Sequence, residues 1–313
     1  MKKRYLLLFA VFLLAFGALF TLLSAAPLQQ RPRDYFEISV VTRESDSSIW
    51  ASIRQGMEQA ANDFDVELRL VTLTETNSVS EQRMLLSREA KGGADALILA
   101  PADPNALEDA VAEAGIPVVT MQAPVGNAPC ISVDNEAMGR ELARSMLPRL
   151  RTGDRVVLLS IFPGEGAVAG RAAGAKQALA QQGVAVEELW LPGGRSAMGE
   201  ALSGLLSDPP ELVIALEPAA LEGAVRVFQG LESAPALCGI GSTSLIVSCL
   251  EKKLIEAIAA QNDFAAGYLA IDAAVAAAEG RPLSPAEPIG FSIVRQETMY
   301  LPENQKLLFP FVR

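Results

Sequence analysis

The chain has 313 residues, of which 50% are hydrophobic and 20% charged, and 26 Lys and Arg against 37 Asp and Glu give a formal net charge of -11. This length exceeds the usual size of one hydrophobic core, so two lobes are expected. The acidic balance disfavours nucleic acid as a partner, because nucleic-acid binders need a basic face. The sequence contains no His, which removes the commonest metal ligand and the usual proton shuttle near neutral pH.

The amino-terminal residues 1–26 are predicted to be a signal or membrane anchor. Three basic residues precede an uncharged apolar run from Tyr5 to Ala26. At about 1.5 Å per residue, a helix of roughly 22 residues reaches about 33 Å, enough for a hydrocarbon core of about 30 Å, whereas signal-peptide cores are usually shorter. Small residues stand where a signal peptidase would cut, but Pro27 would follow the cut. We therefore expect an uncleaved anchor, with a removed signal as the alternative, and an extracytoplasmic chain after it. Residues 27–35 are expected to be a polar linker.

The stretch from Gly93 to Gly139 predicts one β-α-β unit. Residues 94–99 and 116–119 are apolar runs of strand length, and residues 105–114 carry apolar side chains at helical spacing between them. Because both strand runs are apolar throughout, each is expected to be covered on both faces, as in a parallel sheet between two helical layers. Loops that leave the carboxyl ends of such strands form the rim where ligands bind in open α/β sheets.

Strand and helix patterns alternate from residue 36 onward, which predicts an α/β fold. Ser47 or Ser48 is the expected N-cap of the first helix, and Asp134 caps a later one. The expected strands are 38–41, 66–71, 94–99, 116–119, 156–160, 184–189, 212–216, 236–240 and 255–260. The expected helices are 47–64, 78–91, 105–114, 134–147, 168–182, 197–206, 222–231, 245–251 and 265–279.

Four phrases of the sequence, in this order, resemble a known family. They are Asp95-Ala96-Leu97-Ile98-Leu99-Ala100-Pro101, Asp103-Pro104, Ala114-Gly115-Ile116-Pro117-Val118-Val119-Thr120, and Ser132-Val133-Asp134-Asn135 with Gly139. Together they resemble the periplasmic sugar-binding proteins of the ribose-binding type, and the lactose-repressor core is similar too. The resemblance covers about Phe36 to Tyr300.

The resemblance implies a periplasmic-binding-protein-like fold of type I. Two Rossmann-like lobes, each with a parallel sheet flanked by helices, are expected to be joined by a three-strand hinge. By resemblance the crossovers fall near Val133, Gln261 and Phe291. The first lobe is then 36–133 plus 262–291, and the second lobe is 134–261 plus 292–313.

Several side chains at the strand ends are candidate ligand contacts. Trp50 lies where the family has ring-stacking aromatics, although a core role is the alternative. Arg171 matches the family's Arg that binds ligand oxygens, and Gln261 matches a Gln at the second crossover. A solvated Arg and a hinge residue without ligand contact are the respective alternatives. The predicted ligand-binding residues are Arg43, Trp50, Gln122, Arg171, Glu217, Gly241 and Gln261.

Three polar anchors of the family differ in this sequence. Gln122 stands nearest to a usual Asp, Glu217 and Pro218 replace an Asn and an Asp, and Gly241 replaces another Asp. Carboxylates accept two hydroxyl hydrogen bonds in fixed geometry and discriminate strongly. We therefore expect a pocket with one carboxylate, and a ligand with fewer donor hydroxyls or with a modified or charged group facing Arg171.

The cysteines are interpreted first as structural. Cys238 lies in an apolar strand and Cys249 in an amphipathic helix, where free Cys is a small buried hydrophobe. Cys130 has no obvious partner, and no cysteine spacing indicates a metal site or redox pair.

These observations predict an exported solute-binding protein that closes on a small polar ligand, a sugar or sugar-like compound, for ABC-type uptake. The alternative is a membrane-tethered ligand sensor that engages a sensor kinase of a two-component system or another signalling receptor. No cofactor or metal is expected, and nothing supplies a nucleophile-base pair, so an enzyme is not expected. A neighbouring permease and ATPase, as opposed to a histidine kinase and response regulator, would separate transport from signalling.

Overall fold

The computed structural model describes residues 35–44, 50–161, 166–180, 182–191, 195–231, 233–282 and 288–309. The chain divides into two units, Met1–Tyr35 and Phe36–Arg313, and the second holds all the elements below. The predicted anchor at residues 1–26 lies outside the described residues. Among the residues that are described, no helix has the length and apolar character needed to cross a membrane.

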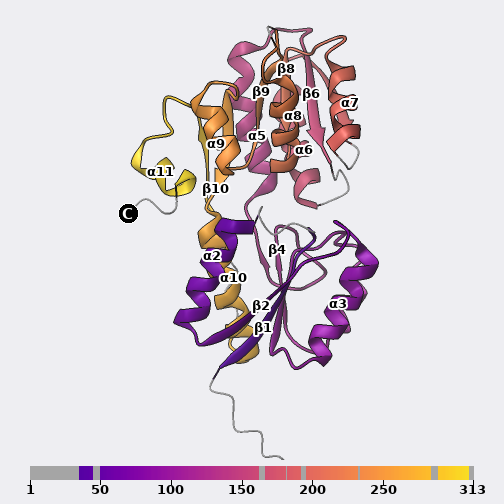
Figure 1. Cartoon of the computed structure of the whole chain (residues 1–313), viewed down its shortest axis with the longest axis vertical. Helices are drawn as coiled ribbons and strands as arrows, with labels where there is room; N and C mark the ends of the chain where they lie inside the picture. Colours follow the sequence, from indigo (N-terminus) through magenta and orange to yellow (C-terminus); the bar gives the residue numbers. More distant parts are fainter. Residues whose placement is uncertain are drawn as a thin grey trace, which may run out of the picture. The chain divides into compact units, whose positions relative to one another are not determined.

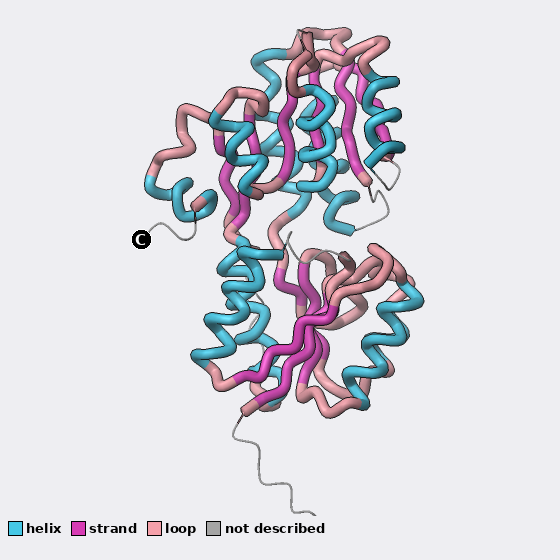
Figure 2. Tube along the Cα trace, viewed as in Figure 1, coloured by secondary structure: helices cyan, strands magenta, loops and turns pink. Residues whose placement is uncertain are grey.

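The first sheet has the strand order β2-β1-β3-β4-β5, and all its pairings are parallel. One buried cluster joins α2 and α10 to the sheet, and another joins α3 to it, so both faces are covered (Figure 2). The continuous apolar runs predict this, because β3 and β4 are buried along their whole length. The strands are β1 Phe36–Val41, β2 Val66–Val71, β3 Ala96–Leu99, β4 Val118–Met121 and β5 Cys130–Ile131. The helices around them are α2 Ala51–Asp63, α3 Val79–Lys91, α4 Glu108–Ala112 and α10 Asp263–Ala278.

The second sheet has the order β11-β10-β9-β8-β6-β7, with β11 antiparallel to β10 and the other pairings parallel. Alternate residues of β6 enter two clusters: Val156 and Leu158 face α5 and α6, and Val157 and Leu159 face α7, α8 and α9. The strands are β6 Arg155–Ser160, β7 Ala185–Trp190, β8 Leu212–Ala215, β9 Ala236–Ile240, β10 Ala257–Gln261 and β11 Phe291–Val294. The helices are α5 Asn135–Met146, η2 Leu147–Arg149, α6 Gly166–Ala180, α7 Arg195–Leu205, α8 Pro218–Phe228, α9 Ser244–Glu251 and α11 Pro302–Leu308.

The chain passes between the two sheets at three places (Figure 1). These places lie between β5 and α5, between β10 and α10, and between α10 and β11. Val133 in the first connection and Ile289 in the third form a parallel bridge. We keep 36–133 plus 262–291 and 134–261 plus 292–313 as the proposed boundaries of the first lobe and the second lobe.

Some predicted element bounds were wrong for local reasons. The helix predicted at 105–114 is only Glu108–Ala112, because the Asp103 carboxylate accepts hydrogen bonds from the backbone N–H groups of Asn105 and Ala106 and holds them in a turn. The helix predicted at 222–231 begins at Pro218, since proline fits the first turn of a helix. The first helix begins at Ala51, and its proposed caps at 47 and 48 lie outside the described residues. The predicted cap Asp134 is confirmed, since its side chain accepts from the Ala137 N–H at 2.8 Å.

Candidate ligand-binding site

A cavity of about 380 Å³ lies at the carboxyl ends of strands from both sheets. Its volume falls in the range of small-molecule sites, and residues of both lobes line it. All seven residues predicted from the sequence are among the lining residues. Those seven are Arg43, Trp50, Gln122, Arg171, Glu217, Gly241 and Gln261.

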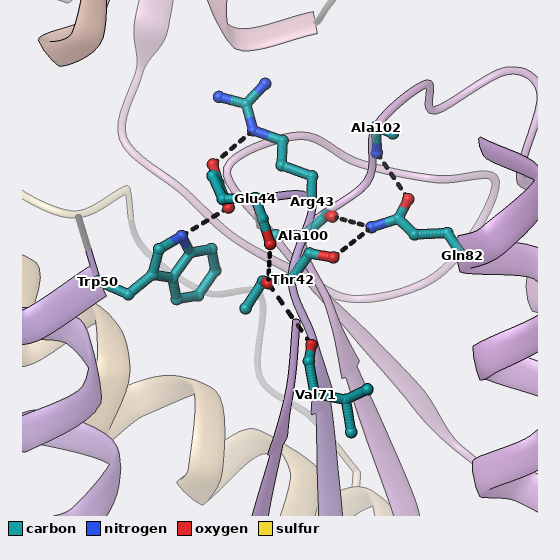
Figure 3. A network of polar contacts seen from close by, with 8 residues as sticks. All are labelled: Thr42, Arg43, Glu44, Trp50, Val71, Gln82, Ala100 and Ala102. Atoms are coloured by element: carbon teal, nitrogen blue, oxygen red, sulfur yellow. Dashed lines mark hydrogen bonds and ion pairs between the residues drawn. The ribbon is translucent and has the colours of Figure 1, made fainter. Parts of the chain in front are cut away.

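The first-lobe wall is a chain of hydrogen bonds centred on Glu44 (Figure 3). Arg43 Nε donates to Glu44 Oε1 at 3.0 Å, and Trp50 Nε1 donates to Glu44 Oε2 at 2.7 Å. All three residues are buried, and Trp50 is only 1% exposed. The indole therefore packs in the core and orients Glu44, and little of its ring surface is left for a ligand.

Gln82 fixes the loops that carry this wall. Its side chain is fully buried, and Nε2 donates to the carbonyls of Thr42 at 2.9 Å and Ala100 at 2.7 Å. Its Oε1 accepts from the Ala102 N–H at 2.8 Å, so both the nitrogen and the oxygen of this amide have backbone partners in the loops (Figure 3). The loops after β1 and β3 are thereby joined to α3. The sequence analysis missed Gln82, although a polar residue on the buried face of α3, beside Leu85 and Leu86, is a usable signal.

The second-lobe wall is centred on Arg171 of α6. Its Nε donates to Asn135 Oδ1 at 2.8 Å and its Nη1 donates to the Leu216 carbonyl at 2.9 Å, so the guanidinium is held in place while it lines the cavity. Asn135 also donates from Nδ2 to the carbonyls of Val133 at 3.2 Å and Gln122 at 3.4 Å. One side chain thus connects the Arg171 guanidinium to the end of β4 in the first lobe.

The position of Arg171 depends on close contact between α5 and α6. A Cβ added to Gly139 would lie 2.0 Å from the Arg171 carbonyl oxygen, and one added to Gly174 would lie 1.9 Å from the Glu136 carbonyl oxygen. No real side chain fits at such distances, so the two helices meet backbone to backbone. The Gly139 of the family-like phrase therefore has a structural role here.

Glu217 and Gly241 follow neighbouring strands of the second sheet. Glu217 is buried, and its carboxylate accepts a hydrogen bond from the Ile161 N–H. Gly241 has a φ of 129°, a conformation that favours glycine, and a Cβ there would lie 3.0 Å from side-chain atoms of Pro218 and Ile246. The backbone conformation explains why this strand end carries no side chain.

Asp263 at the start of α10 also lines the cavity, beside Gln261. Gln261 Nε2 donates to Asp263 Oδ1 at 2.7 Å. Burial raises the pKa of the Asp263 carboxyl, and the Gln261 hydrogen bond and the charge of Arg171 offset this in part.

The expectation of one carboxylate in the pocket is wrong, because Glu44, Glu217 and Asp263 all line the cavity. Glu44 could have been found, since it lies three residues after the end of β1 and next to the predicted Arg43. Asp263 lies beyond a helix N-cap, where an acidic residue has a common structural explanation in the helix dipole. The preference for a ligand with fewer donor hydroxyls loses its basis.

Neither metal nor thiol chemistry is indicated in the described part of the chain. Within it, no group of three or more His, Cys, Asp or Glu is placed to hold a metal ion. The three cysteines are free, and burial raises the pKa of the Cys238 and Cys249 thiols. The interpretation of Cys238 and Cys249 as small buried hydrophobes is confirmed, and Cys130 is partly buried.

Residues 38–282 match a family described as a periplasmic binding protein domain. The chain belongs to this family. It is 24% identical over 259 residues to the ribose import binding protein RbsB of Bacillus subtilis (strain 168), which covers 80% of this chain and 84% of the relative. The resemblance to the ribose-binding type is thereby confirmed, and the family is one of binding proteins.

Solved structures share the fold at low sequence identity. A carbohydrate transporter solute-binding protein from Agrobacterium radiobacter, in complex with D-arabinose, has a TM-score of 0.82 at 19% identity, covering 88% of this chain and 99% of that one. An ABC transporter solute-binding protein from Agrobacterium vitis, bound with α-D-tagatopyranose, has a TM-score of 0.80 at 20% identity, covering 87% and 99%. The predicted fold class, two mainly parallel sheets flanked by helices, is confirmed.

Proposed function

We propose that this protein is an extracytoplasmic solute-binding protein that closes on a cyclic or open-chain sugar and presents it to an ABC-type permease. The observation that carries the proposal is the cavity, which is lined by Arg43 and Glu44 of one lobe and by Arg171 and Glu217 of the other. The family membership and a relative named for ribose import support it.

The charges of the cavity suit a neutral polyhydroxyl compound. Each carboxylate accepts hydrogen bonds from hydroxyl groups, and each guanidinium donates to hydroxyl and ring oxygens. Glu44, Glu217 and Asp263 supply acceptors, and Arg43 and Arg171 supply donors. A sugar presents both kinds of group around one ring, so it can pair with both lobes at once.

Ligand binding is proposed to select a closed arrangement of the lobes. A ligand can shift this equilibrium only through contacts that differ between the open and closed forms. Contacts to both lobes meet this condition, and hinge closure of this type is known for periplasmic binding proteins. Small-angle scattering should show a smaller radius of gyration at saturating ligand. An unchanged radius would indicate a fixed scaffold.

A thermal-shift screen tests the proposed ligand class. The panel should contain D-ribose, D-arabinose, D-tagatose, D-fucose, D-allose, polyols, inositols and nucleosides. A ligand present at 100 times its Kd should stabilise the protein by about 2.7 kcal/mol, which raises the melting temperature measurably. Calorimetry then gives the affinity of each hit. Failure of every sugar in the panel to shift the melting temperature would overturn the proposal.

The proposed location is outside the cytoplasm, with the protein attached to the membrane by its amino-terminal segment. The family implies a place outside the cytoplasm, and the apolar run Tyr5 to Ala26 supports an uncleaved membrane anchor. Carbonate extraction of membranes, with sequencing of the amino terminus, tests the anchor. A soluble form that begins at Pro27 would show that the segment is removed.

A further inference from the structure

The carboxyl-terminal segment forms part of the cavity wall. Leu308 and Phe309, at the end of α11, line the cavity together with residues of both lobes. Helix α11 lies beside β10 (Figure 1), and Leu308 is buried in a core cluster of the second lobe. Asn304 is buried and donates from Nδ2 to the Thr298 carbonyl at 2.9 Å. These contacts hold the segment in place.

The ring of Phe309 stacks on the ring of Tyr300. The rings of Phe309 and Tyr300 are nearly parallel, with an interplanar angle of 8° and centroids 6.2 Å apart. Tyr300 is exposed, does not line the cavity, and donates its hydroxyl to Glu251 Oε1 at 2.5 Å. Phe309 itself is half-buried, so part of its ring surface remains accessible.

Two aromatic side chains occur among the described residues that line the cavity, Trp50 and Phe309. The Trp50 indole is 1% exposed and donates to Glu44, which leaves it little surface for a ligand. A sugar ring has polar edges and an apolar face of C–H groups, and an aromatic ring is a suitable partner for such a face. Among the described residues that line the cavity, the accessible aromatic is therefore Phe309.

We propose that Phe309 is a specificity-determining residue that packs against the C–H face of a cyclic sugar. The inference rests on the proposed function and narrows its ligand class to pyranose or furanose rings. An acyclic polyol lacks a fixed apolar face, so it gains less from Phe309. The polar groups from Arg43, Glu44, Arg171 and Glu217 then fix the hydroxyl groups, and Phe309 selects the ring.

Calorimetry on four forms of the full chain tests the inference. The titrants are D-ribose, D-arabinose, D-tagatose, D-fucose and D-allose, with D-arabitol as the acyclic probe. Phe309→Leu keeps an apolar side chain but removes the aromatic face, and Phe309→Tyr keeps the ring. Tyr300→Leu is the matched control, because it breaks the same ring pair from outside the cavity.

Phe309→Leu should weaken binding of the best sugar by roughly three- to tenfold, the range for an aromatic contact. Its effect on D-arabitol should be less than twofold. Phe309→Tyr should bind the sugar within about twofold of the natural protein, and so should Tyr300→Leu. Both leucine variants should lower the melting temperature of the ligand-free protein by similar amounts.

Each other result has a distinct meaning. Sugar affinity unchanged in Phe309→Leu, or reduced equally in Tyr300→Leu, would show that Phe309 acts only in packing and would overturn the inference. Equal losses for the sugar and for D-arabitol would overturn the selection of rings. A natural protein that binds no sugar would overturn the proposed function, and this inference with it.

Discussion

The two walls of the cavity hold their charged groups by different means. In the first lobe, Glu44 is held by side-chain hydrogen bonds from Arg43 and Trp50, and the amide of Gln82 fixes the loops beneath them. In the second lobe, Arg171 belongs to α6, whose backbone packs directly against Gly139 of α5. The first wall is described by its side-chain hydrogen bonds, whereas the second combines the hydrogen bonds of Arg171 with a close backbone contact between its helix and α5.

The first lobe also has a close helix pair, but there it serves a different purpose. A Cβ on Gly56 would lie 1.9 Å from the Phe264 carbonyl oxygen, and one on Gly267 would lie 1.9 Å from the Ile53 carbonyl oxygen. This contact joins α2 to α10, the helix that enters the first lobe from β10 and begins with Asp263. Close helix packing therefore shapes both lobes, whereas the buried Gln82 amide holds loops of the first lobe. The two devices should fail differently when they are mutated.

Gly139→Ala should have the largest effect, because its Cβ would overlap the Arg171 carbonyl oxygen. The helices must separate, and we expect a loss of about 3 kcal/mol in the free energy of unfolding, the upper part of the range for overpacking. Sugar affinity should also fall, since Arg171 moves with α6. Urea denaturation and calorimetry measure both quantities.

Gly199→Ala is the matched control for this change. It lies in α7 and has no heavy atom within 4 Å of an added Cβ. Alanine there should stabilise the protein by about 0.5–1 kcal/mol through helix propensity. A Gly139→Ala protein as stable as the natural one would refute backbone contact between α5 and α6.

Gln82→Leu tests the first-lobe wall. It leaves the carbonyls of Thr42 and Ala100 and the N–H of Ala102 without this partner. Since each buried unsatisfied group costs about 1–3 kcal/mol, and part of the loss is relieved by local movement, we expect about 2–3 kcal/mol of destabilisation. Gln59→Leu, an exposed amide on α2, should change stability by less than about 0.5 kcal/mol. Equal effects of the two substitutions would show that the buried amide is dispensable.

Arg171→Ala tests the second-lobe wall directly at the ligand. Loss of a hydrogen bond from a charged group should cost about 1.5–3 kcal/mol, or roughly one to two decades in sugar affinity by calorimetry. Arg226→Ala serves as the control, because that guanidinium pairs with Glu222 on α8 and does not line the cavity. Undiminished sugar binding by Arg171→Ala would show that the cavity is not the ligand site.

The sequence predicted residues that line the cavity, but not the contacts that hold those residues in place. Strand-end positions indicated Arg43, Gln122, Glu217 and Gly241, because parallel strands bring their carboxyl ends to one edge. Periodicity shows which face of an element is buried but not which neighbour it meets. The partners of the Gln82 amide, the Gly174 contact and the hydrogen bond from Trp50 to Glu44 therefore needed the structure. Phe309 was missed because the return of the carboxyl-terminal segment to the cavity leaves no local signal.

Asp263→Asn should have the smallest effect, and one that depends on pH. Burial raises the pKa of this carboxyl in the folded protein, so protonation favours folding. Its contribution to stability is complete below the ordinary Asp pKa of about 3.9 and is lost as pH rises through the raised folded-state pKa. Asn has no charge to bury, so the ligand-free variant should melt about one or two degrees higher than the natural protein at pH 7.

The pH series supplies the decisive comparison for Asp263. The difference in melting temperature should shrink as pH falls, because the natural carboxyl then becomes neutral as well. Glu113→Gln, which removes the same charge from an exposed position outside the cavity, should show no comparable gain at pH 7. Sugar affinity should fall modestly in Asp263→Asn, because the amide replaces one of the acceptor oxygens with a donor. A variant that melts lower than the natural protein at pH 7 would mean that the ionised carboxylate stabilises the ligand-free fold, through Gln261 and Arg171, more than its burial costs.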